Sequence, residues 1–207
     1  MKKTATPLKR ARGRPRSVDR ETILAAAMKL VESDLSLPEL ADALDVNLAA
    51  IYRLFGDKVG LYTAMYAEAL GHVDRIEGAT WTAWLDSYVK VLLKLAQRYP
   101  FVVSLQASHK NHYVELRNLS VRSLALVNPG IELMVKAGLD RATAHNALVG
   151  IKAIVYEHAL TELVYSEAPV VLADFDSLGS TGEKRLWQFV KIIRSGLQAE
   201  MKDAKGK

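Results

Sequence analysis

The chain has 207 residues, half of them hydrophobic, which is enough for one medium domain or a small domain followed by a larger one. The absence of cysteine excludes disulfides, a thiol nucleophile and cysteine-bound zinc. No apolar run approaches the ~18 residues of a membrane span, and the basic N-terminus lacks the apolar core of a signal peptide. We therefore expect a soluble, cytoplasmic protein without contact with a membrane.

Positive charge is concentrated at the N-terminus. Residues 1–16 contain seven basic side chains and no acidic one, whereas the net charge of the whole chain is +5, so residues 17–207 carry −2. A basic arm on a nearly neutral body indicates a polyanionic partner, or alternatively a solubilising tail. Because residues 1–17 are polar and contain two prolines, we predict a segment that is disordered until it binds.

Beyond this arm the apolar spacing is helical almost to the end of the chain, and strand-like alternation is absent, which predicts an all-α fold. A first helix is expected near residues 19–33. The second begins at a capping box formed by Ser36 and, three residues later, Glu39, and it runs to about Leu44.

Two more helices follow closely. Asp45 occupies a turn that needs a residue tolerant of left-handed geometry, and Asn47 is a favourable N-cap for a third helix ending near Phe55. Asp57 caps a fourth helix, predicted over residues 58–77. The first three helices are short enough to form a compact unit of their own.

Gly78 marks the predicted domain boundary, which separates residues 18–77 from residues 78–207. The second domain begins with a long amphipathic helix whose apolar side chains recur up to position 95. This helix must break at Pro100, because proline in a helix interior removes a hydrogen bond and clashes with the preceding turn.

The remainder of the chain is also predicted to be helical. Shorter helices are expected within residues 101–127, then an Asn-Pro-Gly turn at residues 128–130 and a short helix to Ala137. Two long helices, over residues 140–166 and 182–202, complete the chain.

The helix predicted over residues 140–166 carries apolar side chains on more than one face. A helix that is apolar nearly all round is buried on both sides, here either as the central helix of a monomer or between its own core and a partner subunit. We favour a homodimer in which this helix and that of residues 182–202 form a four-helix interface.

The end of the third helix and the start of the fourth carry a recognisable motif, which comprises Ile51, Tyr52, Arg53, Leu54, Phe55, Gly56, Asp57 and Lys58. It resembles the tetracycline-repressor (TetR) family of bacterial regulators, as does the layout of a small N-terminal three-helix unit and a larger helical domain. The resemblance implies a homodimeric transcriptional regulator, typically a repressor, that binds a near-palindromic operator in double-stranded DNA and leaves it when a small-molecule effector binds.

The resemblance also implies which residues contact DNA. The third helix would enter the major groove, with the residues at its start facing base edges. Side chains at its end and at the start of the fourth helix would contact phosphate or bases, and one residue of the first helix would contact the backbone. In that order they are Asn47, Leu48 and Ala49; Tyr52, Arg53 and Lys58; and Thr22.

Several positions depart from the family pattern. Leu48 and Leu54 replace commonly polar, basic or histidine residues, Asp45 replaces the turn glycine, and Pro38 stands where a base-reading residue can occur. Leucine and alanine cannot hydrogen-bond base edges, although they pack on thymine methyl groups. We therefore expect fewer direct base contacts and more reliance on the arm and on DNA shape.

The arm itself fits this expectation. Arg12, Gly13, Arg14, Pro15 and Arg16 match the core of an AT-hook, an extended segment whose arginines enter a narrow A·T-rich minor groove. Such a groove concentrates negative potential and attracts arginine. Generic attraction to phosphate is the alternative role of these arginines.

Aromatic and histidine side chains in the second domain are candidates for an effector pocket, because ligand sites favour aromatic walls with a few polar groups. The alternative is that they are ordinary core or surface residues. Two of the histidines have a spacing that suits a metal, but a second pair of ligands is not evident, so we predict no metal and no cofactor. The pocket candidates are Trp84, Tyr88, His109, His112, Tyr113, Tyr156 and His158.

Enzyme motifs are not found: there is no nucleophile elbow, phosphate loop, dinucleotide fingerprint or HExxH. We therefore do not expect an enzyme. The remaining alternative to a ligand-responsive regulator is an architectural protein that binds A·T-rich DNA without control by an effector.

Overall fold

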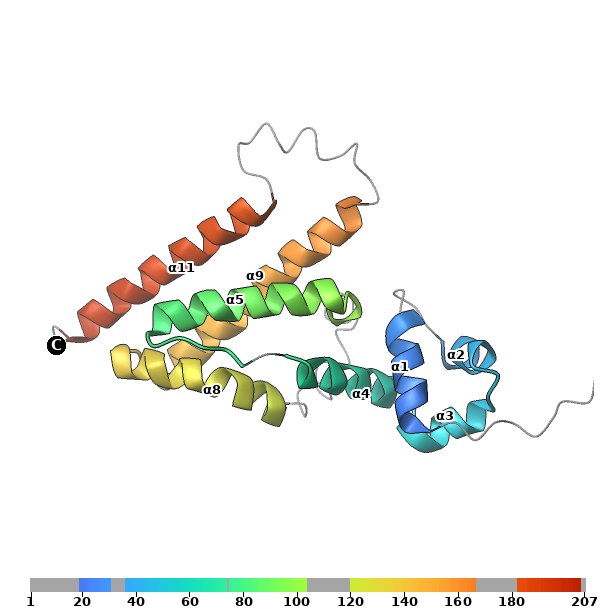
Figure 1. Ribbon diagram of the computed structural model, residues 1–207. Helices are drawn as coiled ribbons and strands as arrows, with labels where there is room; N and C mark the ends of the chain where they lie inside the picture. The colour runs from blue at the N-terminus through green and yellow to red at the C-terminus, as the bar shows by residue number, and fades with distance from the viewer. Residues whose placement is uncertain (1–18, 31–35, 74, 104–119, 167–181, 206–207) are drawn as a thin grey trace, which may run out of the picture. The chain divides into compact units, whose positions relative to one another are not determined.

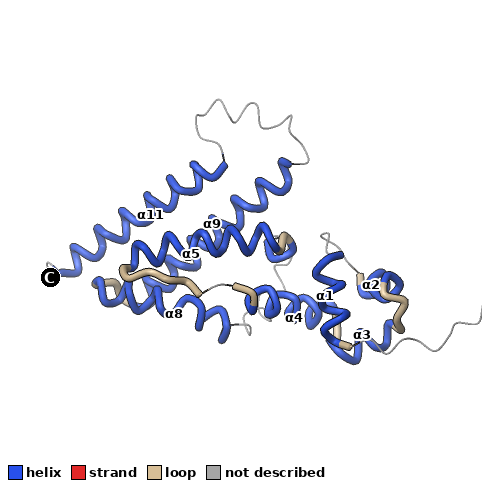
Figure 2. The backbone as a smooth tube through the Cα atoms, viewed as in Figure 1, coloured by secondary structure: helices blue, strands red, loops and turns tan. Residues whose placement is uncertain are grey.

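The computed structural model describes residues 19–30, 36–73, 75–103, 120–166 and 182–205 (Figure 1). Every regular element in these ranges is a helix (Figure 2), as the sequence predicts. None of the described helices is both long and apolar enough to cross a membrane. Contacts between residues divide the chain into two units, with the division between Leu61 and Tyr62. The functional domains predicted from the sequence, residues 18–77 and 78–207, stay a prediction.

The first unit is built from three short helices: α1 (Arg20–Leu30), α2 (Leu37–Ala43) and α3 (Leu48–Phe55). Helix α2 contacts both α1 and α3. Each helix contributes one apolar side to a common core, whose burial drives the three to pack together. The buried side chains are Ile23, Leu24, Ala27, Leu37, Leu40, Ala41, Ile51, Phe55 and Leu61.

The capping box at the start of α2 is confirmed. The amide of Glu39 donates to Ser36 Oγ at 3.3 Å, and the amide of Ser36 donates to Glu39 Oε2 at 3.0 Å. These bonds satisfy two backbone donors that a helix N-terminus otherwise leaves without a partner. The Ser36 hydroxyl donates to Glu39 Oε2 at 2.6 Å and is the main cause that lowers the pKa of the Glu39 carboxyl, followed by the Ser36 amide.

Replacing the cap tests its contribution. Ser36→Ala is expected to lower the free energy of unfolding by about 1 kcal/mol, because the amide of Glu39 loses its acceptor. Urea denaturation of the full chain measures the change. Ser36→Thr is the control that keeps a hydroxyl acceptor, and equal stability of the alanine and threonine variants would contradict a role for the cap.

The turn between α2 and α3 also forms as predicted. Asp45 adopts the left-handed conformation with φ +50°, and the amide of Val46 donates to Ala41 O at 3.0 Å. Asn47 then caps α3, since its Oδ1 accepts from the amide of Ala49 at 2.9 Å. Asp57 caps the next helix in the same way, accepting from the amide of Gly60 at 2.8 Å.

Helix α4 (Lys58–Gly71) is shorter than predicted, and the expectation that it continues to residue 77 was wrong. The amide of His72 donates to Ala69 O and that of Val73 to Leu70 O, which tightens the last turn. Gly71, the last residue of α4, is a poor helix former. Beyond the end of the helix, Ile76 is buried.

The second unit includes α5 (Trp81–Arg98), α8 (Ser120–Ala137), α9 (Arg141–Ser166) and α11 (Gly182–Lys205). Helix α9 lies at the centre and contacts the other three, while α5 also contacts α8 (Figure 1). Thr80 caps α5 through a bond from the amide of Ala83. The helix ends before Pro100, as predicted.

The turn predicted at residues 128–130 was wrong, because Pro129 and Gly130 lie inside α8. A Cβ on Gly130 would lie 2.2–2.5 Å from three ring atoms of Trp84, so this glycine allows a helix to pack closely against an indole. The end of α8 is marked instead by Gly138, which has φ +119°. Packing against α5 therefore overrides the local turn signal.

The limits of the other helices differ slightly from expectation. The described part of helix α1 ends at Leu30, and residues 31–35 lie outside the described residues. Helix α9 reaches Ser166 as predicted and is capped by Asp140, which accepts from the amide of Thr143 at 2.9 Å. Helix α11 continues to Lys205, three residues beyond the predicted end.

Candidate nucleic-acid interface

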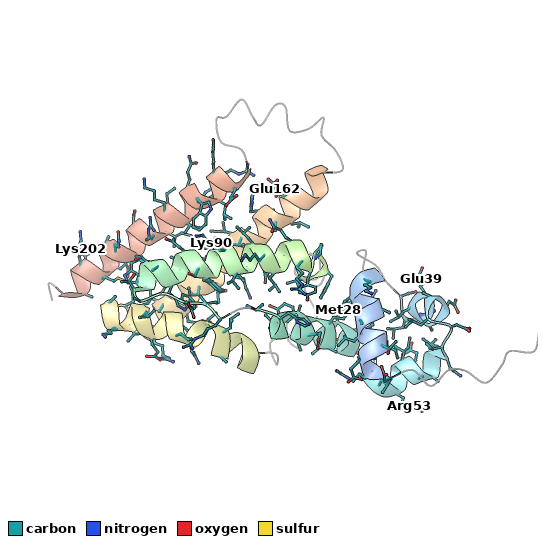
Figure 3. The ribbon with its side chains drawn as sticks, in the orientation of Figure 1. Met28, Glu39, Arg53, Lys90, Glu162 and Lys202 are labelled. Carbon is teal, nitrogen blue, oxygen red and sulfur yellow. The ribbon has the colours of Figure 1, made fainter. Side chains whose placement is uncertain are left out.

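Helix α3 has one buried side and one exposed side. Ile51 and Phe55 are buried in the core of the first unit, whereas Tyr52 is 48% exposed. Arg53, labelled in Figure 3, is also exposed. The exposed side of α3 therefore presents an aromatic hydroxyl and a guanidinium next to each other in the sequence.

The predicted residues at the start of α3 are only partly accessible. Asn47 is exposed, but its Oδ1 is occupied by the cap bond to Ala49. Ala49 is exposed and Leu48 is half-buried. The exposed start of this helix is therefore largely apolar and offers few groups that could hydrogen-bond to a base edge.

The start of α1 lies beside the end of α3. The Arg20 guanidinium is 5.2 Å from the centroid of the Phe55 ring, a cation–π arrangement. Asp19 Oδ1 accepts from the amide of Thr22 at 2.7 Å, and the Thr22 side chain lowers the pKa of Asp19. The predicted contact residue Thr22 is exposed. Sequence reasoning missed Arg20, since nothing in the pattern links it to Phe55.

Lys58 stands at the N-terminus of α4 and is half-buried. Its charge is near enough to Glu39 to contribute to the lowered pKa of that carboxyl, after the Ser36 hydrogen bonds. Lys58 therefore approaches the same surface from a fourth element, with a carboxylate as neighbour.

Charge in the first unit is distributed against expectation for a polyanion-binding surface. Residues 17–61 carry four basic and eight acidic side chains, a formal charge of −4, while residues 1–16 carry +7. Residues 17–61 are thus negative overall, and the positive charge of this unit lies in residues 1–16. The predicted arm contacts Arg12, Arg14 and Arg16 lie outside the described residues.

The second unit contains a hollow of about 690 Å³ next to Trp84. Trp84 is 1% exposed, and its Nε1 has no hydrogen-bond partner among the described residues. Apolar side chains line the hollow, and charged groups of both signs stand around them. The lining residues are Arg75, Ile76, Glu77, Gly78, Trp84, Ala125, Leu126, Pro129, Glu132, Leu133 and Lys136.

The other aromatic candidates lie deeper in the same unit. The Tyr88 ring stacks on Trp84 with centroids 5.3 Å apart, and its hydroxyl donates to Leu148 O at 3.5 Å. Tyr156 is buried, and burial raises the pKa of both tyrosines. His158 is half-buried, and desolvation is the main reason that its pKa is lowered.

Comparison with known proteins was made by sequence and by structure. No family model matches the chain, and no curated protein sequence matches it. The solved structures do match: ActR of Streptomyces coelicolor, a TetR family protein, has 16% identity and a TM-score of 0.65, covering 90% of this chain and 99% of its own. BioQ of Mycobacterium smegmatis has 19% identity, a TM-score of 0.66 and coverages of 88% and 99%.

A third structure, a TetR variant of Acinetobacter baumannii, has 19% identity and a TM-score of 0.60, with coverages of 91% and 97%. The agreement extends over nearly the whole of each chain. The fold is that of the TetR-family regulators. In this fold the elements identified above keep their expected order, with the helix-turn-helix of α2 and α3 preceding a larger helical part.

Within the TetR fold, the individual site residues stay predictions. Trp84 lines the hollow, whereas Tyr88, Tyr156 and His158 do not. His109, His112 and Tyr113 lie outside the described residues. The two histidines whose spacing suits a metal are therefore among the residues that are not described. In the described part of the chain, no group of three or more metal-binding side chains comes together.

Helices α9 and α11 leave several apolar side chains exposed. Helix α9 buries Ala144, Leu148, Ile151 and Val155 in its own unit, but Val149 is 46% exposed. Helix α11 exposes Phe189 by 48% and Ile192 by 66%. Glycines 150 and 196 have open space around their Cα atoms within one chain. The two helices thus present an apolar face that their own chain leaves uncovered.

Proposed function

We propose that the chain is a DNA-binding transcriptional regulator of the TetR type, a homodimeric repressor released from its operator by a small molecule. The observation that carries this proposal is the exposed side of α3, where Tyr52 and Arg53 follow an Asn47-capped turn. A helix in this position of a helix-turn-helix lies in the major groove of DNA. The absence of enzyme motifs in the sequence agrees with a role without catalysis.

DNA contact divides between the helix and the arm. Tyr52, Arg53 and Lys58 are assigned to phosphates and base edges, while the folded unit contributes little long-range attraction because of its formal charge of −4. The arm joins the chain just before Arg20, whose guanidinium lies over Phe55 at the end of α3. Its arginines therefore start close to the recognition helix and would reach an adjacent minor groove.

Dimerisation is assigned to the uncovered face of α9 and α11. A contiguous exposed apolar face on two neighbouring helices is typical of a protein–protein interface. Pairing this face with its copy forms a four-helix interface and covers Val149, Phe189 and Ile192. Two DNA-binding units would then meet half-sites about one helical turn apart, roughly 34–36 Å or a multiple.

Effector control is assigned to the second unit. Structures of similar fold carry ligands: ActR is known with actinorhodin and the TetR variant with minocycline. An effector that prefers a conformer with a different separation of the two DNA-binding units shifts the population away from the DNA-bound form. A coupling of ~1–3 kcal/mol would change DNA affinity about 5–150-fold, which is enough for regulation.

Substitution on α3 tests the DNA-binding role. Arg53→Ala is expected to cost about 1–3 kcal/mol of DNA binding, and Tyr52→Phe a smaller amount, with the fold unchanged. Fluorescence anisotropy with labelled DNA measures the affinity, and circular dichroism checks the fold. The matched control is Lys29→Ala, an exposed basic residue in the last turn of α1. Wild-type affinity in both α3 variants would refute the placement of the recognition helix.

A further inference from the structure

The hollow next to Trp84 (the Trp84 hollow) has the size of a small-ligand site. Its volume is about 690 Å³, and sites for small organic ligands typically occupy roughly 300–1,000 Å³. One wall is the segment of residues 75–78, which joins α4 to α5, and the other is α8, which runs beside it (Figure 1). Both walls belong to the second unit. The hollow is therefore large enough to hold an effector.

Both walls are held against Trp84 by close contacts of glycines. A Cβ on Gly78 would lie 2.3 Å from the backbone nitrogen of Trp84, and a Cβ on Gly130 would lie 2.2 Å from the indole ring. Trp84 is itself fully buried and stacked on Tyr88. Such tight packing fixes the two walls in place, and a rigid site loses less conformational entropy when it binds a ligand.

Trp84 brings to this hollow a hydrogen-bond donor that lacks an acceptor. Its Nε1 is buried without a hydrogen-bond partner among the described residues. A buried indole N–H usually has a partner, because losing water without gaining an acceptor is unfavourable. The atoms that meet Gly130 are Cζ3, Cε3 and Cη2 of the six-membered ring, so that contact does not cover Nε1. The N–H is therefore available to an acceptor on a ligand.

A proline in α8 brings the complementary acceptor. Pro129 has no N–H, so the carbonyl of Ala125, four residues earlier, loses its ordinary helical donor. Ala125 and Pro129 both line the Trp84 hollow, and both are exposed. Residues of one hollow thus supply a donor that lacks an acceptor and an acceptor that lacks its helical donor.

The charged side chains around the Trp84 hollow cancel one another. Arg75 and Glu77 stand on one wall. Glu132 and Lys136 stand on the other, where Glu132 already pairs with Arg141. Two cations and two carboxylates give the lining a formal charge of zero, so its net charge attracts neither a cationic nor an anionic ligand. The lining therefore suits a neutral molecule.

We propose that the Trp84 hollow is the effector site, and that the effector is a neutral aromatic molecule with a carbonyl group and a hydroxyl group. The assignment rests on the proposed function and specifies the chemical class of its ligand. The carbonyl accepts a hydrogen bond from Trp84 Nε1, and the hydroxyl donates one to the carbonyl of Ala125. The aromatic body covers the half-buried side chains of Leu126 and Leu133, which line the same hollow.

Three bicyclic probes that differ in their polar groups test this chemistry. Umbelliferone is a hydroxycoumarin with both groups, herniarin is its methyl ether without the donor, and naphthol keeps the hydroxyl but lacks the carbonyl. Calorimetry with the full chain at mildly acidic pH, which keeps umbelliferone protonated, measures the three affinities. Umbelliferone should bind roughly twofold to tenfold more tightly than either of the others, the usual net effect of one neutral hydrogen bond.

Three variants locate the binding. Ala125→Trp fills the hollow from an exposed position and should weaken umbelliferone binding by about tenfold or more, with the fold retained. Leu124→Trp is the matched control, since it adds the same indole at a neighbouring exposed position outside the hollow, and it should leave the affinity unchanged. Trp84→Phe removes the N–H and should abolish the preference for umbelliferone over naphthol, a ratio that a uniform loss of affinity does not move.

Circular dichroism verifies the fold of each variant. Unchanged umbelliferone affinity in Ala125→Trp, or an equal loss in Leu124→Trp, would overturn the location of the site. A preference for umbelliferone over naphthol that survives in Trp84→Phe would overturn the role of the indole N–H.

Release of DNA separates this assignment from the proposed function. Umbelliferone should weaken the binding of the wild type to DNA from upstream of its own gene and should have no effect on Ala125→Trp, which binds that DNA normally. If the wild type fails to bind DNA at all, the proposed function falls, and the probes still decide whether the hollow takes the ligand. If DNA binding holds but the three probes bind equally, only the effector chemistry is wrong. Binding in the hollow that leaves DNA affinity unchanged would contradict the effector role.

Discussion

Gly130→Ala is expected to destabilise the second unit by roughly 1–3 kcal/mol, although alanine is the better helix former by about 1 kcal/mol. The added Cβ would lie 2.2–2.5 Å from ring atoms of Trp84, well inside van der Waals contact. The indole cannot retreat easily, because Trp84 is fully buried and stacked on Tyr88. Thermal and urea denaturation of the full chain measure the loss.

A double-mutant cycle decides whether the collision is the cause. Trp84→Phe removes the outer ring atoms that the new methyl group would meet, at the cost of a cavity. Gly130→Ala should then be much less costly in the Trp84→Phe background than in the wild type, which gives a coupling energy of opposite sign to the two losses. Simple additivity of the two changes, or a stabilising Gly130→Ala, would contradict the packing described for α8.

Charges on the uncovered face of α11 are expected to dissociate the dimer. The double variant Phe189→Glu and Ile192→Glu places two carboxylates where an apolar interface is proposed, and burying unpaired charge is strongly unfavourable. The protein should sediment as a monomer, and its affinity for a two-half-site operator should fall by about two orders of magnitude, because the second half-site no longer binds intramolecularly.

A matched double variant on the same helix serves as the control. Lys191→Gln with Gln198→Glu changes the net charge by the same two units, at exposed positions on the side of α11 away from Phe189 and Ile192. This protein should remain dimeric and bind DNA normally, as sedimentation velocity and anisotropy will show. The proposed interface is wrong if the Phe189/Ile192 variant stays a dimer, or if both variants dissociate alike.

Local features of the fold were predictable because they depend on hydrogen bonds between residues three or four positions apart. The capping box at Ser36, the left-handed Asp45, and the caps Asn47 and Asp57 all form as the sequence indicates. In each case a short polar side chain satisfies a backbone group of its own turn. The limits of α2 and α3, and therefore the position of the exposed α3 side chains, follow from these residues.

The errors have long-range causes. Asn-Pro-Gly at residues 128–130 has the composition of a turn, but Gly130 is required for close packing against Trp84, forty-six positions earlier. The early end of α4 has a local cause as well, because its last residue, Gly71, is a poor helix former. The contact between Gly130 and Trp84 leaves no local signal, so the composition of residues 128–130 alone assigns this segment to the wrong element.

The candidate sites divide in the same way. The motif around Tyr52 and Arg53 is contiguous, so it identifies the exposed side of α3 directly. The contacts of Arg20 with Phe55 and of Gly130 with Trp84 join residues from separate helices. The spacing of Leu148 and Tyr156 is visible in the sequence, but whether that face is buried is decided by how α5 and α9 pack.

Binding of the purified full chain to DNA from upstream of its own gene, against scrambled DNA of equal composition and across a salt series, tests the central claim most directly. A sequence-selective regulator binds the upstream DNA at physiological salt and ignores the scrambled DNA, and this is the result we predict. Equal and steeply salt-dependent binding to both would instead indicate an architectural A·T-rich binder that relies on its basic arm. No binding at any salt concentration would contradict the assignment of α3 to DNA altogether.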